Sequence, residues 1–135
     1  MTAIYLLDTN ICIYIARQRP LAVLKRFEQL QQGEVVMSFI THGELMFGAE
    51  KSQHRDETIE KLNRLTEFIP VVLPSPSTAL HYGDIRAQLK RAGTPIGAND
   101  LWIAAHARSS NLVLVSNNTR EFQRVPGLKM ENWAA

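Results

Sequence analysis

A chain of 135 residues with 45% hydrophobic and 21% charged residues has an ordinary globular composition, which argues against intrinsic disorder. The net charge of +2 permits an anionic partner, and a single cysteine, Cys12, excludes a framework of internal disulfides. No apolar run reaches the ~20 residues of a membrane span, and the N-terminus lacks the pattern of a signal peptide. We therefore expect one cytoplasmic domain over residues 1–135.

Apolar runs and helical periodicities alternate along the chain, and the loops between them are short. In chain order we predict a strand at 4–7, helices at 10–17 and 20–30, a strand at 35–39, helices at 41–50 and 58–68, a strand at 69–73, helices at 78–92 and 97–109, a strand at 112–116, a turn at 117–122 and a short strand at 127–131. Strands that alternate with helices imply an α/β fold, a parallel sheet with helices on both faces.

Asp8 ends the first apolar run, at the carboxyl end of a predicted central strand, where open α/β sheets place their sites. Aspartate after a strand is also a common helix cap, although Thr9 and Asn10 are better placed to cap the helix that follows. A metal-ligand role and a capping role for Asp8 both stay open.

Glu44 shares one face of its helix with Ile40, Gly43 and Phe47, which puts a carboxylate in or beside an apolar stripe. An unpaired buried carboxylate is costly, so this position favours a cation or a hydrogen-bond partner. The alternative is a capping box with Thr41, which would place Glu44 at the helix start.

Asp100 lies in the first turn of a helix that is apolar nearly all round and is therefore expected to be buried. It either complements the helix dipole or projects into a site, since Asn99 can serve as the cap. Asn118 and Glu121 follow the fourth strand, which we expect beside the first. Their polar stretch also suits an ordinary turn.

Carboxylates from four separate stretches are thus predicted at one edge of the sheet. Clustered acids repel one another and raise each other's pKa values, and a hard divalent cation relieves that repulsion. Oxygen ligands without a cysteine or histidine pattern suit Mg²⁺ or Mn²⁺ rather than Zn²⁺. A polyanionic substrate would also need a basic rim, for which the candidates are Arg86 with Lys90 and Arg91, and Arg120 with Arg124. A solvated helix face is the alternative for the first group.

Four segments in order, residues 6–10 (LLDTN), 44–49 (ELMFGA), 97–106 (GANDLWIAAH) and 117–128 (NNTREFQRVPGL), resemble the PIN-domain ribonucleases. Within that family the chain closely resembles the VapC toxins of VapBC toxin–antitoxin pairs, over essentially its whole length. The resemblance implies a three-layer α/β/α PIN fold with strand order 3-2-1-4-5. It also implies an endoribonuclease that depends on Mg²⁺, with Mn²⁺ able to take its place.

The resemblance places the catalytic acids at Asp8, Glu44 and Asp100, with Asp8 and Asp100 as direct metal ligands. The fourth acidic position of many PIN domains is occupied by Asn118 here, and Glu121 stands in for it. Whether the site binds one or two metal ions therefore stays open. We expect Glu44 and Glu121 to bind metal directly or through water. Contacts to RNA are expected at Arg86, Arg120 and Arg124.

Similar toxins from enteric bacteria cut initiator tRNA in its anticodon stem-loop, which makes that tRNA the expected substrate and inhibition of translation the expected effect. Water is the expected nucleophile, which would leave a 5′-phosphate and a 3′-hydroxyl. By the same resemblance we expect a homodimer and a VapB-type antitoxin partner.

Other classes share parts of this pattern. Haloacid dehalogenase phosphatases need a second aspartate where this chain has Asn10, and receiver domains need a lysine where it has Ser116-Asn117-Asn118. DNA flap nucleases are longer and richer in acids. A PIN-like module that binds RNA or a partner without cutting is the remaining alternative.

Overall fold

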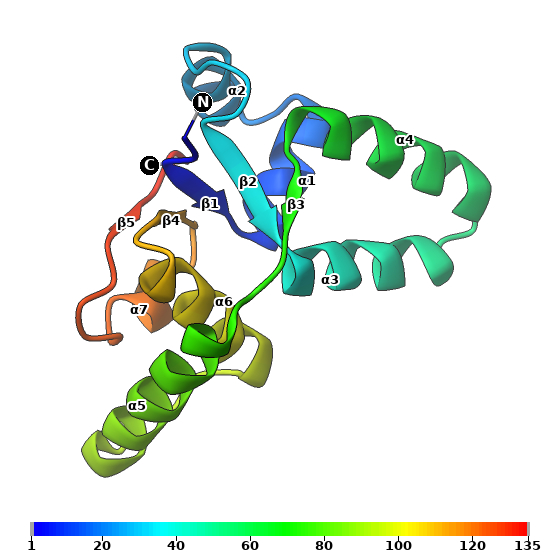
Figure 1. Cartoon of the computed structure of the whole chain (residues 1–135). Coiled ribbons are helices and arrows are strands. Elements are labelled where there is room, and N and C mark those ends of the chain that lie inside the picture. The colour runs from blue at the N-terminus through cyan, green and yellow to red at the C-terminus, as the bar shows by residue number, and fades with distance from the viewer. Residues whose placement is uncertain (1, 135) are drawn as a thin grey trace.

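The computed structural model describes residues 2–134 and contains a five-stranded parallel sheet with helices on both faces (Figure 1). The strand order is β3-β2-β1-β4-β5, which confirms the predicted order. In chain order the elements are β1 (Tyr5–Leu7), α1 (Thr9–Arg17), α2 (Leu21–Glu28), β2 (Val35–Ser38), α3 (Phe39–Glu50), α4 (Arg55–Phe68), β3 (Val71–Val72), α5 (Pro76–Ala92), α6 (Ala98–Ser109), β4 (Val113–Val115), α7 (Thr119–Phe122) and β5 (Met130–Glu131).

The short central strands supply both hydrophobic cores. Leu6 and Leu114 pack with α5 and α6 on one face, whereas Leu7 and Val115 pack with α1, α2 and α4 on the other. Successive side chains of a strand point to opposite faces, so each three-residue strand is buried on both sides. This double burial explains why β1 reads as an unbroken apolar run.

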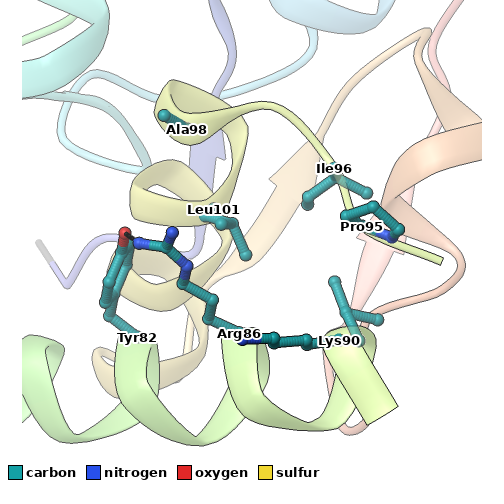
Figure 2. Close-up of a pocket in the computed structure, with 8 residues that line it drawn as sticks. Tyr82, Arg86, Lys90, Pro95, Ile96, Ala98 and Leu101 are labelled. Atoms are coloured by element: carbon teal, nitrogen blue, oxygen red, sulfur yellow. Dashed lines mark hydrogen bonds between the residues drawn. The ribbon is translucent and has the colours of Figure 1, made fainter. Parts of the chain in front are cut away.

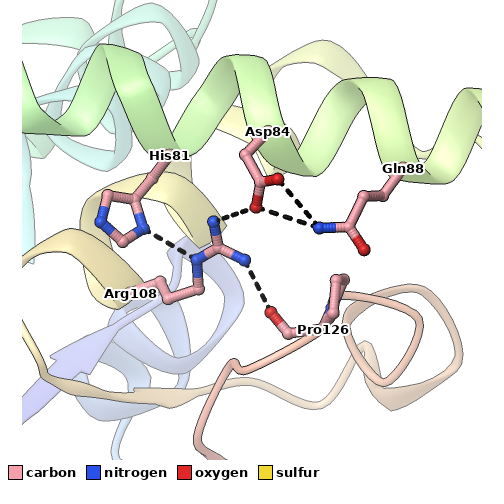
Figure 3. Close-up of polar contacts among 5 residues, drawn as sticks. All are labelled: His81, Asp84, Gln88, Arg108 and Pro126. Carbon is pink, nitrogen blue, oxygen red and sulfur yellow. Dashed lines mark hydrogen bonds and ion pairs between the residues drawn. The ribbon is translucent and has the colours of Figure 1, made fainter.

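Helices α5 and α6 are joined by Arg108, near the end of α6 (Figure 3). Its guanidinium donates to Nδ1 of His81 (2.8 Å), to Oδ2 of Asp84 (2.6 Å) and to the carbonyl of Pro126 (2.8 Å). Gln88 also donates to Asp84. We call these five residues the arginine junction. Because Arg108 and Gln88 donate to it, the pKa of Asp84 is held below its ordinary value.

Helix α3 begins earlier than predicted, because no loop separates it from β2. Ser38 is the last residue of the strand and also the N-cap, accepting from the amide of Ile40 (3.2 Å). Thr41 is buried inside the helix instead of capping it, so the alternative of a capping box between Thr41 and Glu44 is wrong.

Two other helices also begin earlier than predicted, because the connection before each is shorter. Asp8 itself caps α1, in place of Thr9 or Asn10. Ser75 precedes α5, and its amide donates to the hydroxyl of Thr78 (3.2 Å). Residues 119–122 form the short helix α7 rather than an open turn.

None of the helices in residues 2–134 combines the length and the apolar character that a membrane span requires.

Candidate active site

The carboxyl ends of β1 and β4, the first half of α3 and the first turn of α6 meet at one edge of the sheet. They bring together the predicted acids Asp8, Glu44, Asp100 and Glu121, which we call the acidic edge. The charges of Glu121, Glu44 and Asp8 all act on Asp100, so the four groups share one electrostatic environment. Parallel strands end at the same edge, which is why residues more than a hundred positions apart converge.

Asp8 is buried and serves the helix and the site together. Its Oδ1 accepts from the amide of Ile11 (3.1 Å), which caps α1, and its Oδ2 accepts from the hydroxyl of Ser116. Burial raises the pKa of Asp8, while these hydrogen bonds lower it in part and the charge of Glu44 raises it further. The two interpretations of Asp8 therefore do not exclude each other.

Glu44 is held by side chains from two other helices. Its Oε1 accepts from the hydroxyl of Thr9 (2.6 Å), and its Oε2 accepts from the amide of Asn99 (3.3 Å). Asn99 therefore bonds a carboxylate and does not cap α6, whose N-cap is Gly97. These bonds fix Glu44 between α1 and α6.

Asn118 joins the two acids of the later segments. Its amide nitrogen donates to Glu121 (2.9 Å) and lies 3.5 Å from Oδ2 of Asp100. Burial and then the neighbouring Glu121 raise the pKa of Asp100 to about 7. Bonds from Asp100 and Asn118, with the charge of Arg124, hold the pKa of Glu121 below its ordinary value. The two neighbouring carboxyl groups therefore shift each other's pKa in opposite directions.

The donor set of the acidic edge fits a hard divalent cation. Its ligand atoms are all oxygens, and within residues 2–134 none of its four carboxylates forms an ion pair. In the same part of the chain, no three acidic, histidine or cysteine side chains lie close enough to form a complete metal-binding group. A bound cation would offset the repulsion among these carboxylates.

The predicted RNA contacts are distributed around this edge. Arg124 donates to the carbonyl of Pro95 (3.1 Å) and lies near enough to Glu121 to lower its pKa. Arg120 is exposed on α7. Arg86 is on α5 and donates to the hydroxyl of Tyr82 (2.8 Å).

Sequence reasoning missed the neutral partners of the acids, Thr9, Asn99 and Ser116. We interpreted Thr9 and Asn99 as caps and Ser116 as the end of a strand. Thr9 and Asn99 are next to Asp8 and Asp100 in the sequence, and Ser116 follows the strand that pairs with β1. These positions are the signal by which the three residues could have been predicted. Asn117 forms a further link, because it accepts from Asn10 and donates to Tyr14 across the start of α1.

Comparison with known proteins agrees with this geometry. The PIN domain family model matches residues 5–128. The chain is 47% identical over 129 residues to "Ribonuclease VapC2" of Haemophilus influenzae, covering 96% of this chain and 97% of the relative. It is 45% identical over 130 residues to "tRNA(fMet)-specific endonuclease VapC" of Shigella flexneri, covering 96% and 98%.

Solved structures give the same result. A chain in the structure of VapBC-1 from nontypeable Haemophilus influenzae superposes with a TM-score of 0.90 at 46% identity, over 98% of this chain and 99% of that chain. A chain of DNA-bound VapBC from Salmonella typhimurium gives 0.91 at 39% identity, over 98% and 99%. With the matching family model and the acidic edge, these likenesses show that the chain belongs to the PIN-domain family and, within it, to the VapC ribonucleases.

Proposed function

We propose that this chain is the toxin of a type II toxin–antitoxin pair and that it hydrolyses RNA at the acidic edge with Mg²⁺, or with Mn²⁺ in its place. One observation carries the proposal. Asp8, Glu44, Asp100 and Glu121 converge from four segments, and no cationic side chain within residues 2–134 forms an ion pair with any of them. Fold stability alone does not favour such a cluster, because its members repel one another.

The proposed roles follow from the contacts of each residue. Asp8 and Asp100 hold the metal, and Glu121 binds it directly or through water, while Asn118 sets the distance between Asp100 and Glu121. The bound metal would supply positive charge to the scissile phosphate and lower the pKa of a water molecule. Glu44, fixed by Thr9 and Asn99, orients the attacking water or accepts its proton.

The proposed substrate is initiator tRNA, cut in its anticodon stem-loop in the cytoplasm, with loss of translation as the result. The relative from Shigella flexneri, 45% identical, carries the name of a tRNA(fMet)-specific endonuclease, which supports this choice. Arg120 and Arg124, on the α7 side of the acidic edge, are proposed to contact the RNA backbone.

The proposed antitoxin site is a groove of about 640 Å³ between α1, α3 and α4. Apolar side chains such as Ile13, Leu45 and Leu62 line it, and Thr9 and Glu44 lie at the end nearest the acidic edge. The structural neighbours are VapBC complexes, which supports an antitoxin as its occupant. A partner in this groove would reach Glu44 and block the site.

A homodimer is proposed through exposed apolar side chains beside β3. Ser38 pairs with Val72 in the sheet, and Phe39 and Leu73 are the residues that follow them in the chain. They are 56% and 72% exposed, and Leu80 of α5 is 76% exposed. Apolar surface of this kind is typical of an interface between protein chains. Leu80→Lys should shift the mass in solution from dimer to monomer.

Cleavage of total tRNA by purified, antitoxin-free protein with Mg²⁺ tests the function. We expect one discrete fragment with a 5′-phosphate, from one tRNA, and none after EDTA is added. A matched DNA hairpin should stay intact. Cyclic phosphate ends would contradict hydrolysis by water. Binding of tRNA without any cleavage would favour the non-cutting module.

A further inference from the structure

A pocket of about 370 Å³ lies between the C-terminal half of α5 and the loop that leads into α6 (Figure 2). Leu89, Ile96 and Leu101 give it apolar walls, and Arg86 and Lys90 lie along its α5 side. Its volume falls in the range of ~300–1,000 Å³ that is usual for small-ligand sites. The pocket thus combines apolar walls with two cations.

The two cations have no acidic partner. Within residues 2–134, neither Arg86 nor Lys90 forms an ion pair, and both are exposed. Arg86 donates to the hydroxyl of Tyr82, whose ring stacks on Trp102 with 3.8 Å between centroids and 15° between planes. The stacked rings hold the tyrosine, and through it the guanidinium, at the pocket. The positive charges of Arg86 and Lys90 are therefore available to an anionic ligand.

The pocket borders the acidic edge. Ala98 and Leu101, in the first turn of α6, line it, and Asp100 lies between them in the sequence. Successive helical residues are turned by about 100°, so Asp100 and Leu101 occupy adjacent faces of one turn. Arg124, which lies near Glu121, donates to the carbonyl of the pocket residue Pro95. A polymer bound at the acidic edge therefore has this pocket directly beside it.

We propose that this pocket binds one unpaired nucleotide next to the scissile phosphate. The base packs between the apolar walls, and its phosphate contacts Arg86 and Lys90. Apolar or aromatic surface for a base, joined to cations for the backbone, is the combination by which proteins bind single-stranded RNA. The assignment rests on the proposed ribonuclease function and adds a source of specificity, since a paired and stacked base cannot enter the pocket.

The test uses stem-loop RNAs in which single nucleotides near the cut are replaced, one at a time, by an abasic residue. Wild-type protein is compared with Arg86→Gln, Lys90→Gln and the control Arg91→Gln. Arg91 is exposed on the same helix but does not line the pocket. Its substitution therefore removes the same charge without changing the pocket. Both kcat/KM with Mg²⁺ and RNA binding with Ca²⁺, by fluorescence anisotropy, are measured.

We expect one abasic position to lower kcat/KM and affinity about 10-fold with wild-type protein, from the loss of base packing. Arg86→Gln and Lys90→Gln should weaken binding of the intact RNA about 3- to 10-fold and reduce that abasic penalty. Arg91→Gln should leave the penalty unchanged.

An equal abasic penalty in all four proteins, or no penalty at any position, would overturn the pocket assignment. If wild-type protein still cleaved the RNA, the proposed ribonuclease function would stand. If wild-type protein binds RNA with this Arg86 dependence but does not cut it, the nuclease fails and the pocket stands. If Arg86→Gln weakens only antitoxin binding, the pocket serves a protein partner and the assignment is wrong.

Discussion

An aspartate lies near each end of helix α6, Asp100 in its first turn and Asp84 of α5 beside Arg108, and the fold treats the two charges in opposite ways. At the arginine junction, Arg108 neutralises Asp84 and holds its pKa low (Figure 3). At the acidic edge, Asp100 faces other acids, and burial with Glu121 raises its pKa to about 7. The same fold thus supplies an internal cation to one aspartate and withholds it from the other.

This difference separates a carboxylate that has a cationic partner inside the chain from one that is proposed to bind a metal. The arginine junction links α5, α6 and the segment after α7 with charge balanced inside the chain. The acidic edge keeps an excess of negative charge that destabilises the metal-free protein. A cluster of carboxylates that repel one another points to a ligand that supplies the missing positive charge from outside.

The largest expected effect comes from removing one carboxylate charge at each end. Asp100→Asn should lower RNA cleavage by at least about 100-fold, because the site loses a metal ligand. The matched change Asp84→Asn should leave cleavage within a few-fold of wild type. Rates are compared on the same RNA, with circular dichroism to confirm folding. Similar losses from both variants would contradict the division between the two ends.

The arginine junction should dominate stability instead. Arg108→Met removes bonds to His81, Asp84 and the carbonyl of Pro126, and leaves polar groups unpaired. We expect a loss of about 2 kcal/mol in the free energy of unfolding, measured by urea denaturation. Its control is Arg120→Met, an exposed arginine that should change stability little. Equal effects would mean that the junction is not a structural link.

The pH dependence of stability should report the acidic edge. The pKa of Asp100 is about 7 in the folded protein, against an ordinary value of 3.8. As the pH rises, the unfolded chain therefore releases this proton at a lower pH than the folded protein does. Metal-free protein should therefore lose stability between about pH 4 and pH 7 and then level off. Partial solvent screening limits the loss from this group to about 1 kcal/mol.

Melting curves at several pH values, with and without Mg²⁺ or Mn²⁺, check this dependence. Either metal should raise the melting temperature most above pH 7, where the carboxylates are ionised. Asp100→Asn should flatten the slope and weaken the response to metal. A slope and a metal response unchanged in this variant would sink the assignment of both to Asp100.

The smallest effect is expected from a neutral partner of the acids. Thr9→Val removes the donor to Glu44 but keeps the shape of the side chain. We expect kcat to fall about 10-fold or less with KM nearly unchanged, because Glu44 is still present but less well oriented. Thr9→Ser restores the hydroxyl and should recover the rate. No recovery would show that packing, not the hydrogen bond, is the cause.

The sequence predicted the order of the elements and the convergence of the acids, because both depend on local patterns and one rule of topology. Short apolar runs mark strands buried on both faces, and residues that follow parallel strands share an edge. Cys12 is buried on α1. The predicted helix starts at Thr41 and Thr58 were wrong by a few residues, since the observed connections are shorter.

The partners of the acids could not be predicted, because each comes from a segment far away in the chain. Thr9 reaches Glu44 across 35 positions, and Ser116 reaches Asp8 across 108. Local sequence assigns such polar residues to caps and turns, which are their commonest roles. Which role a polar residue takes depends on the side chain that the fold brings opposite it.

The sequence by itself therefore predicted the parallel sheet and the acids that meet at one of its edges. Tertiary structure decided how those residues are charged and held. Asp84 has Arg108 as its cationic partner, whereas Asp100 forms no ion pair within residues 2–134 and its helical turn lines a pocket. The physical reason is that composition and periodicity act within one segment, whereas burial, hydrogen bonding and the electrostatic field at a carboxylate are sums over every segment packed around it.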